Sequence, residues 1–289
     1  MNPSTKASEW INSVIGPHLG ARRNCTWSAY LGQAQTNSLG GITYLLPSEG
    51  KVLETGEEFT LLKITLKRFL VVANALLDKP VNVGDKVALK FYGLKRFDGT
   101  AADGADDPAV GNVRSFALTG AQTLFPVKWP GRYLGINEKF KDDYTEIQNP
   151  YLRDMIKQLE DIPVNGGLRK LANILVDANA THLTFNDPTE EMSAEDAPAV
   201  NLVVKSAKFE GGLQIAYDRA SDTYTISLKP SDSGQAPTVL ENVHFCELGE
   251  VLIDRIDDGA WLLAKVTLLS VAPKKRTSVA ANQAMAQAA

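Results

Sequence analysis

The sequence predicts an α+β fold that is dominated by antiparallel β-sheet and carries a central helical hairpin. Apolar and polar residues alternate with period two between residues 58 and 92 and again from residue 200. Between these stretches, residues 149–180 carry apolar residues at helical spacing. The 289 residues are 44% hydrophobic and 22% charged, which is ordinary for a globular protein with a sizeable core.

The chain is expected to open with a short amphipathic helix. Ser4 is its predicted N-cap, and Gly16-Pro17 is its predicted end. The apolar stripe of this helix consists of Trp10, Ile11, Val14 and Ile15. A Gly-, Ser- and Thr-rich segment follows, and it contains three aromatic residues, Trp27, Tyr30 and Tyr44.

Two predicted strands between residues 58 and 92 share one design, with an apolar face for the core and an opposite face that carries two lysines and an aromatic ring. In the first strand the apolar residues Leu62, Ile64 and Leu66 alternate with the other face, which consists of Lys63, Thr65, Lys67 and Phe69. In the second strand Val87, Leu89 and Phe91 alternate with Lys86, Lys90 and Tyr92.

The remaining elements follow from turn and helix signals. An Asp/Gly/Ala loop over 98–111 precedes a predicted strand over 113–119, and the helical hairpin begins at Asn149-Pro150, a cap followed by a first helical position. A β-hairpin is expected near the end of the chain, with strands 251–256 and 261–271 joined by a turn at Asp257-Asp258-Gly259. The tail from 273 to 289 is expected to be disordered in isolation.

Charge divides the chain unequally. Residues 1–135 hold 15 Lys/Arg and 11 Asp/Glu, a balance of +4, whereas residues 136–289 hold 15 and 23, a balance of −8. We therefore divide the chain into a basic and aromatic nucleic-acid-binding half (1–135), a helical hairpin with an acidic loop (136–199), a C-terminal β half (200–272) and the tail (273–289).

Several classes of protein are disfavoured by what the sequence lacks. It contains no GxSxG, P-loop, HExxH or post-strand GxGxxG motif, so we expect no enzyme and no cofactor. The histidines are scattered, and Cys25 and Cys246 are too few for a disulfide framework, so we expect no metal site and reduced thiols. No apolar run is long enough to cross a membrane and no signal peptide opens the chain, which predicts a cytoplasmic protein without a membrane partner.

Cations and aromatic rings are interleaved in several clusters. Single-stranded nucleic acid is bound in this manner, because a basic groove follows the phosphates while bases stack on rings. The competing interpretation places the rings in the core and the lysines on guarded strand edges. The candidate nucleic-acid-binding residues are Arg22, Arg23, Trp27, Lys63, Lys67, Arg68, Phe69, Lys86, Lys90, Tyr92, Lys95, Arg96, Phe97, Lys128, Trp129, Arg132, Tyr133, Lys274, Lys275 and Arg276.

In outline, the chain resembles the Drc proteins, the single-stranded-DNA-binding RNA polymerase cofactors of short-tailed phages that package a virion RNA polymerase. The resemblance rests on size, on the stretches Leu66-Lys67-Arg68-Phe69 and Lys95-Arg96-Phe97, and on the short basic tail rich in Ala and Gln. It implies binding of single-stranded DNA through a fold distinct from the OB barrel, and recruitment of a phage RNA polymerase in the host cell cytoplasm. The chain lacks the acidic C-terminal tip of replication-type single-strand binders.

Two other functions stay open at this point. A structural or assembly protein of a virus or mobile element would also be β-rich and free of catalytic motifs. A hydrolase with a site assembled across the fold is the weaker alternative, because such sites need no local signature. The sequence leaves open whether the chain forms a homo-oligomer and whether it prefers DNA or RNA.

Overall fold

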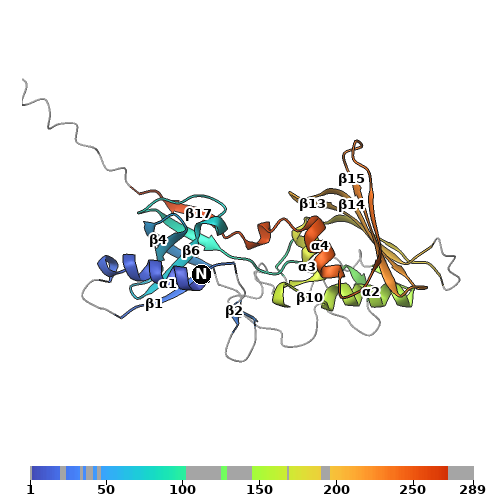
Figure 1. The fold of residues 1–289 in the computed structure, drawn as a ribbon, viewed down its shortest axis with the longest axis horizontal. Coiled ribbons are helices and arrows are strands. Elements are labelled where there is room, and N and C mark those ends of the chain that lie inside the picture. Colours follow the sequence, from blue (N-terminus) through green and yellow to red (C-terminus); the bar gives the residue numbers. More distant parts are fainter. Residues whose placement is uncertain are drawn as a thin grey trace, which may run out of the picture. The chain divides into compact units, whose positions relative to one another are not determined.

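The computed structural model describes residues 2–19, 24–32, 35–36, 42–43, 47–101, 125–128, 145–167, 169–189 and 196–272. Within these ranges the chain contains four α-helices and mostly antiparallel strands, and no sheet closes into a barrel, which confirms the predicted α+β class. The chain forms two compact units (Figure 1). The first comprises Met1–Gln33, Leu45–Tyr92 and Leu262–Ala289, and the second comprises Ala34–Tyr44 and Gly93–Trp261.

The first unit is built on a six-stranded sheet in the order β1-β6-β5-β4-β7-β17. Strand β1 runs parallel to β6, and all other neighbours are antiparallel. The strands are β1 (Thr26–Tyr30), β4 (Ser48–Thr55), β5 (Phe59–Lys63), β6 (Arg68–Ala73), β7 (Lys86–Lys90) and β17 (Lys265–Ser270). Strand β17 thus comes after the whole second unit along the chain but completes the sheet of the first unit. The prediction from sequence instead places it in the C-terminal β half, with the strands after residue 200.

Helix α1 (Pro3–Val14) packs on one face of this sheet (Figure 1). Its N-cap is Asn2 rather than the predicted Ser4, because the Asn2 side chain accepts the Ser4 N–H at 3.0 Å. The core beneath the helix joins Ala7, Ile11 and Ile15 to apolar residues of β5 and β6. The opposite face of the sheet carries a second core, formed by Tyr30, Val52, Leu62, Leu70, Val72, Val87, Leu89, Phe91, Ala264 and Val266.

The predicted continuous strand through residues 62–69 is wrong, because the chain turns back at residues 64–67 and forms the β5–β6 hairpin. The Thr65 hydroxyl accepts the Arg68 N–H at 3.1 Å, and the Ile64 N–H donates to the Arg68 carbonyl at 2.9 Å. Leu66, which the alternation assigned to the core, lies exposed in this turn. A Thr side chain that bonds to its own turn therefore ends the strand.

Two hydrogen-bonded groups fix the returning segment 262–272 in the first unit. The Tyr30 hydroxyl donates to the Leu262 carbonyl, and burial raises the pKa of Tyr30. The Asp85 carboxylate accepts the backbone N–H groups of Ala272 and Asn82, each at 2.9 Å, and these bonds lower the pKa of Asp85. Both contacts join residues far apart in sequence, so β17 is held at both of its ends.

The second unit pairs a five-stranded antiparallel sheet, in the order β12-β13-β14-β15-β16, with three helices on one face (Figure 1). Its strands are β12 (Thr181–Asn186), β13 (Ala199–Lys205), β14 (Glu210–Asp218), β15 (Thr223–Pro230) and β16 (Thr238–Val243). Its helices are α2 (Pro150–Asp161), α3 (Leu171–Asp177) and α4 (Leu248–Ile256). The short pairs are β2 (Gln35–Thr36) with β3 (Ile42–Thr43), β8 (Val127–Lys128) with β9 (Thr145–Glu146), and β10 (Pro163–Val164) with β11 (Arg169–Lys170).

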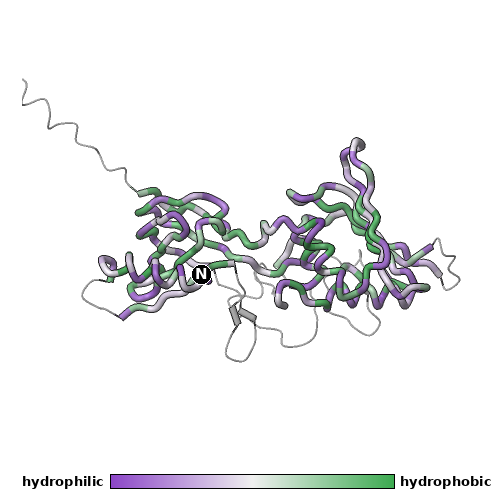
Figure 2. Tube along the Cα trace, in the orientation of Figure 1, coloured by the Kyte–Doolittle hydropathy of each residue, from purple (hydrophilic) through white to green (hydrophobic). Residues whose placement is uncertain are grey.

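Helix α2 confirms the predicted helix start. The Asn149 side chain accepts the N–H groups of Tyr151 and Leu152 at 2.9 and 3.1 Å, and Pro150 occupies the first position. Hydrophobic and hydrophilic residues alternate along the helix (Figure 2), and its buried apolar side chains are those of the predicted stripe, Leu152, Met155, Ile156 and Leu159.

The predicted C-terminal β-hairpin is wrong, because residues 248–256 form helix α4. Leu248, Leu252 and Ile256 are all buried, and their spacing of four residues places them on one helical face against the second core. The other predicted strand of this hairpin contains β17, which pairs with β7 instead.

A buried arginine joins three segments of the second unit. The Arg169 side chain is 0% exposed and forms ion pairs with Asp177, at 3.0 Å, and with Asp257. Its guanidinium also donates twice to the Asn165 side chain, at 3.1 and 2.8 Å, and stacks 3.9 Å from the centre of the Trp261 ring. Together, these partners compensate the positive charge of the guanidinium group, which is removed from water.

Adjacent glycines of β14 provide a matched test of packing in the second sheet. A Cβ on Gly211 would lie 2.2 Å from the Lys229 carbonyl oxygen, whereas a Cβ on Gly212 would meet nothing nearer than 3.9 Å. We expect Gly211→Ala to lower the free energy of unfolding by about 2 kcal/mol, because backbone must move to relieve the overlap. Gly212→Ala should be neutral or stabilising in the same thermal denaturation. Equal effects of the two substitutions would contradict this packing.

Candidate nucleic-acid interface

The register of the first sheet brings lysines from four strands to one face. Directly opposite residues of antiparallel neighbours share a face. Lys51 of β4 lies opposite Lys63 of β5 and also opposite Lys86 of β7. Lys90 of β7 lies opposite Lys265 of β17. We call this surface the lysine face, and it consists of Lys51, Lys63, Lys86, Lys90 and Lys265.

The side chains of the lysine face are accessible. Lys63 is half-buried and the other four lysines are exposed. Among the described residues of these strands, two acids of β4 share this orientation. The Glu49 carboxylate lies 3.4 Å from the Lys86 ammonium, and Glu54 lies opposite Leu61, on the side of β5 that carries Lys63. Positive charge therefore exceeds negative charge here by three, although the described residues of the first unit carry a nearly balanced charge overall.

The lysines are not needed to fix the register of these strands. The opposite sides of β4 and β7 carry Val52, Val87 and Leu89, which are at most 1% exposed and already specify which face is inward. Like charges directly opposite one another destabilise a sheet. Three such pairs among neighbouring strands are therefore a cost to stability, and an anion bound across them would offset it.

One row across the sheet leads from the lysine face to an aromatic ring, with a position that α1 covers between them. Lys86, Lys51 and Lys63 are followed in the row by Phe69 of β6 and Trp27 of β1. Trp27 is 39% exposed, so part of its ring is available for stacking. Phe69 is 2% exposed and packs in the core beneath α1, so the prediction that its ring stacks on a base is wrong.

The remaining predicted residues of the first unit lie near this row or on β7. Lys67 and Arg68 are exposed in and after the β5–β6 turn, which directly follows Lys63. Tyr92 is half-buried beyond the end of β7. The predicted alternation of β7 is confirmed, because Val87, Leu89 and Phe91 are buried while Lys86 and Lys90 are exposed.

The cluster at residues 95–97 belongs to the second unit rather than to the lysine face. Lys95 is exposed and forms an isolated β-bridge with Ala101, while Arg96 is half-buried. The Phe97 ring lies 4.8 Å from the buried Phe125 ring and packs against the second core. Its contacts are those of a core residue.

Several predictions fall outside the described residues. They are the site residues Arg22, Arg23, Trp129, Arg132, Tyr133, Lys274, Lys275 and Arg276, the side chain of Lys128 on β8, the predicted strand 113–119 and the tail 273–289. These residues stay predictions.

Sequence reasoning missed two lysines of this face, Lys51 and Lys265. Lys265 begins an alternation with Val266, Thr267 and Leu268 that resembles the pattern of β7, and this was the available signal. The sequence signal for Lys51 was weaker, because Gly50 and the register shift between Val52 and Glu54 interrupt the period of two in β4.

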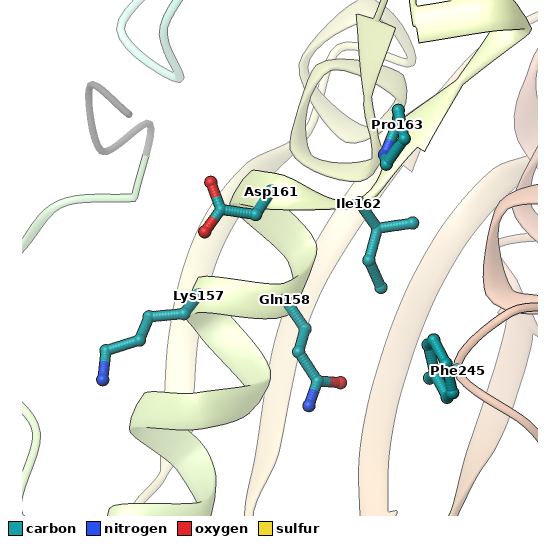
Figure 3. A pocket seen from close by; sticks show the side chains of 6 residues that line it. All are labelled: Lys157, Gln158, Asp161, Ile162, Pro163 and Phe245. Carbon is teal, nitrogen blue, oxygen red and sulfur yellow. The ribbon is translucent and has the colours of Figure 1, made fainter. Parts of the chain in front are cut away.

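Other candidate sites of the second unit lack this concentration of charge. A shallow pocket beside the end of α2 is lined by Lys157, Gln158, Asp161, Ile162, Pro163 and Phe245. Figure 3 shows the Lys157 and Asp161 side chains pointing away from the Phe245 ring. Its two charges are of opposite sign, and the polar side chains do not converge as they do in ligand sites.

A second aromatic group surrounds Tyr217. Its ring stacks on Tyr151 with centres 5.9 Å apart, and Arg219 lies 4.8 Å from the Tyr151 ring centre. The Tyr217 hydroxyl donates to Asp222 at 2.6 Å, and this bond raises the pKa of Tyr217 to about 12. The Tyr151 and Tyr217 side chains thus already interact with charged groups of the protein, the cation of Arg219 and the anion of Asp222.

The described residues contain no group of three His, Cys, Asp or Glu side chains that could hold a metal ion. None of the helices in these ranges is long and apolar enough to span a membrane, since the longest have 12 residues and a span needs about 20.

Comparison of the chain with protein-family models, with curated proteins and with solved structures gave no match. The interpretation of the lysine face therefore rests on its own geometry.

Proposed function

We propose that the chain binds single-stranded DNA across the lysine face, with the phosphates over the lysines and a base stacked on Trp27. The observation that supports this most is the set of directly opposed lysine pairs, Lys51 with Lys63 and Lys86, and Lys90 with Lys265. A polyanion is the ligand that relieves such repulsion, since its phosphates lie at regular intervals and release counterions on binding.

A single strand fits this surface better than a duplex. Trp27 stands in the same row as three of the lysines, and stacking requires a base that is not already paired in a helix. A duplex reader usually inserts a helix into the major groove. Helix α1 is poorly suited to that role, because its one lysine, Lys6, forms an ion pair with Glu58 at 2.9 Å.

The role in the cell follows from the resemblance to phage cofactors. We place the protein in phage transcription or replication in the host cytoplasm, where it would recruit a phage RNA polymerase to exposed template. The acidic part of the chain supports a second task, since residues 136–289 carry a balance of −8 and would repel DNA within a Debye length of about 8 Å. Such a surface is suited to a basic protein partner.

The experiment is a titration of the full chain with single- and double-stranded oligonucleotides of one sequence at several salt concentrations. We expect tighter binding to the single strand, with log affinity falling linearly as log salt rises. An RNA strand of the same sequence tests the preference for DNA, and heparin tests whether charge alone is enough. Equal affinity for single strand, duplex and heparin, or no binding at low salt, would contradict the proposal.

A further inference from the structure

The turn between β5 and β6 presents an aliphatic side chain to solvent. Leu66 is 84% exposed, more than any other large apolar side chain that the structure describes. The Thr65 hydroxyl accepts the N–H groups of Lys67 and Arg68, at 3.4 and 3.1 Å, and the Lys67 carbonyl accepts the Thr26 N–H of β1 at 2.8 Å. The turn is thus fixed by its own threonine and by the neighbouring strand, although the Leu66 side chain is not buried in the fold. We call residues 64–67 the Leu66 turn.

Three cations flank the Leu66 turn. Lys63 directly precedes it, Lys67 lies in it, and Arg68 directly follows it. Residues 59–77 contain no Asp or Glu, and none of the three cations forms an ion pair with another residue that the structure describes. An apolar side chain among unpaired cations is complementary to a ligand that combines negative charge with apolar faces. The phosphates and bases of a nucleic acid offer this combination.

The Leu66 turn lies at an end of the sheet that carries further lysines. Strands β5 and β7 both run antiparallel to β4, so they run parallel to each other and finish at the same end of the sheet. Strand β5 finishes at Lys63, just before the turn, and β7 finishes at Lys90, which lies opposite Lys265. A nucleic acid bound across the lysine face would therefore reach the Leu66 turn at this end.

We propose that Leu66 is a wedge that enters the base stack where a single strand leaves a duplex, so that the protein opens duplex ends. Proteins that deform duplexes insert apolar side chains such as leucine between bases, while neighbouring cations contact the backbone. Leu66 would be buried against a base, and Lys67 and Arg68 would bind the phosphates beside it. This inference rests on the proposed function, because the departing strand is taken to lie on the lysine face.

An anionic membrane would also attract an aliphatic side chain that is flanked by cations. Nucleic acid is favoured, because one leucine buries far less apolar surface than the single acyl chain that by itself gives only reversible membrane binding. A base needs no more than one inserted side chain, and the turn presents one. Vesicle binding is therefore the competing outcome of the test.

The experiment uses the full chain and a forked DNA, a duplex with single-stranded tails, that carries 2-aminopurine in its first base pair. We expect the unmodified protein to raise the 2-aminopurine fluorescence, because the base loses its stacking neighbour. Leu66→Asn should leave this signal unchanged and should weaken fork binding about tenfold, because the burial of the leucine side chain is lost. Its affinity for the isolated single strand should stay within about twofold, since the phosphate contacts are intact.

Two comparisons isolate the wedge from ordinary binding. A protein that binds single strands opens duplexes by mass action, but this effect is the same for two variants of equal single-strand affinity. Leu268→Asn is the matched control, because Leu268 is 51% exposed and lies opposite Val87, on the side of the sheet away from the lysine face. This control should open the fork as the unmodified protein does, and circular dichroism of each variant checks folding.

The outcomes separate this inference from the proposed function. An unmodified protein that binds the isolated strand but leaves the fork closed would overturn the wedge alone. So would a Leu66→Asn variant that opens the fork equally well, or an equal loss in Leu268→Asn. Binding to vesicles of anionic lipid that Leu66→Asn abolishes would assign the turn to a membrane instead. No binding to the isolated strand at low salt would overturn the proposed function, and the wedge with it.

Discussion

Replacing Arg169 with methionine should lower the free energy of unfolding of the second unit by about 3–5 kcal/mol, as for the loss of one partner from a buried ion pair. The substitution leaves the carboxylates of Asp177 and Asp257, each 7% exposed, without their cation. It also removes the ring contact with Trp261. Hydrogen exchange of the β14 amides measures this loss in the second unit by itself.

Two further variants separate charge from packing. Adding Asp177→Asn and Asp257→Asn to Arg169→Met should restore part of the stability, because no unpaired charge is then buried. Lys157→Met removes an exposed ion pair with Asp154 and should change stability by less than about 0.5 kcal/mol. If Arg169→Met behaved like Lys157→Met, the cluster would not be an important part of the second core.

Replacing Lys51, Lys63 and Lys86 with glutamine together should weaken single-strand binding about 100-fold at low salt and reduce the salt slope by about 2, at 0.7 per phosphate contact. The stability of the first unit should not fall, because the substitution also removes two like-charge pairs. Titration with a single-stranded oligonucleotide gives the affinity, and thermal denaturation gives the stability. Loss of binding together with gain or retention of stability distinguishes an interface from a structural role.

The control is a triple glutamine variant of exposed lysines in the second unit, Lys157, Lys205 and Lys229, which removes the same net charge. We expect it to bind nearly as well as the unmodified chain. Trp27→Ala should weaken binding with an unchanged salt slope, because stacking releases no counterions. Equal losses in the two lysine variants would show that net charge, and not the lysine face, governs binding.

Local patterns predicted the elements whose signals lie within a few residues. Helix α2 has its cap at Asn149 and its apolar stripe as expected, because capping and helical periodicity are short-range effects. Strand β7 has the expected faces, because alternation by itself decides which side chains are buried. The mixed fold class followed from the same periodicities.

Patterns over short apolar stretches were ambiguous. Residues 251–256 fit a strand or a helix, and contacts with the second core made them helix α4. The alternation through residues 62–69 concealed a turn, since the Thr65 side chain bonds to the backbone two and three residues later. The same turn placed Phe69 beneath α1, in a core that includes residues far away in the sequence.

By itself, the sequence determined the fold class, the helix α2 and the faces of β7, because each depends on periodicity along one segment. Only the tertiary structure decided that Lys51, Lys63, Lys86, Lys90 and Lys265 share a surface, and that β17 completes the first sheet after the chain has built the second unit. The physical reason is that register between strands is fixed by packing of the opposite, buried face. That packing joins side chains from positions 30 to 266, which no local pattern relates.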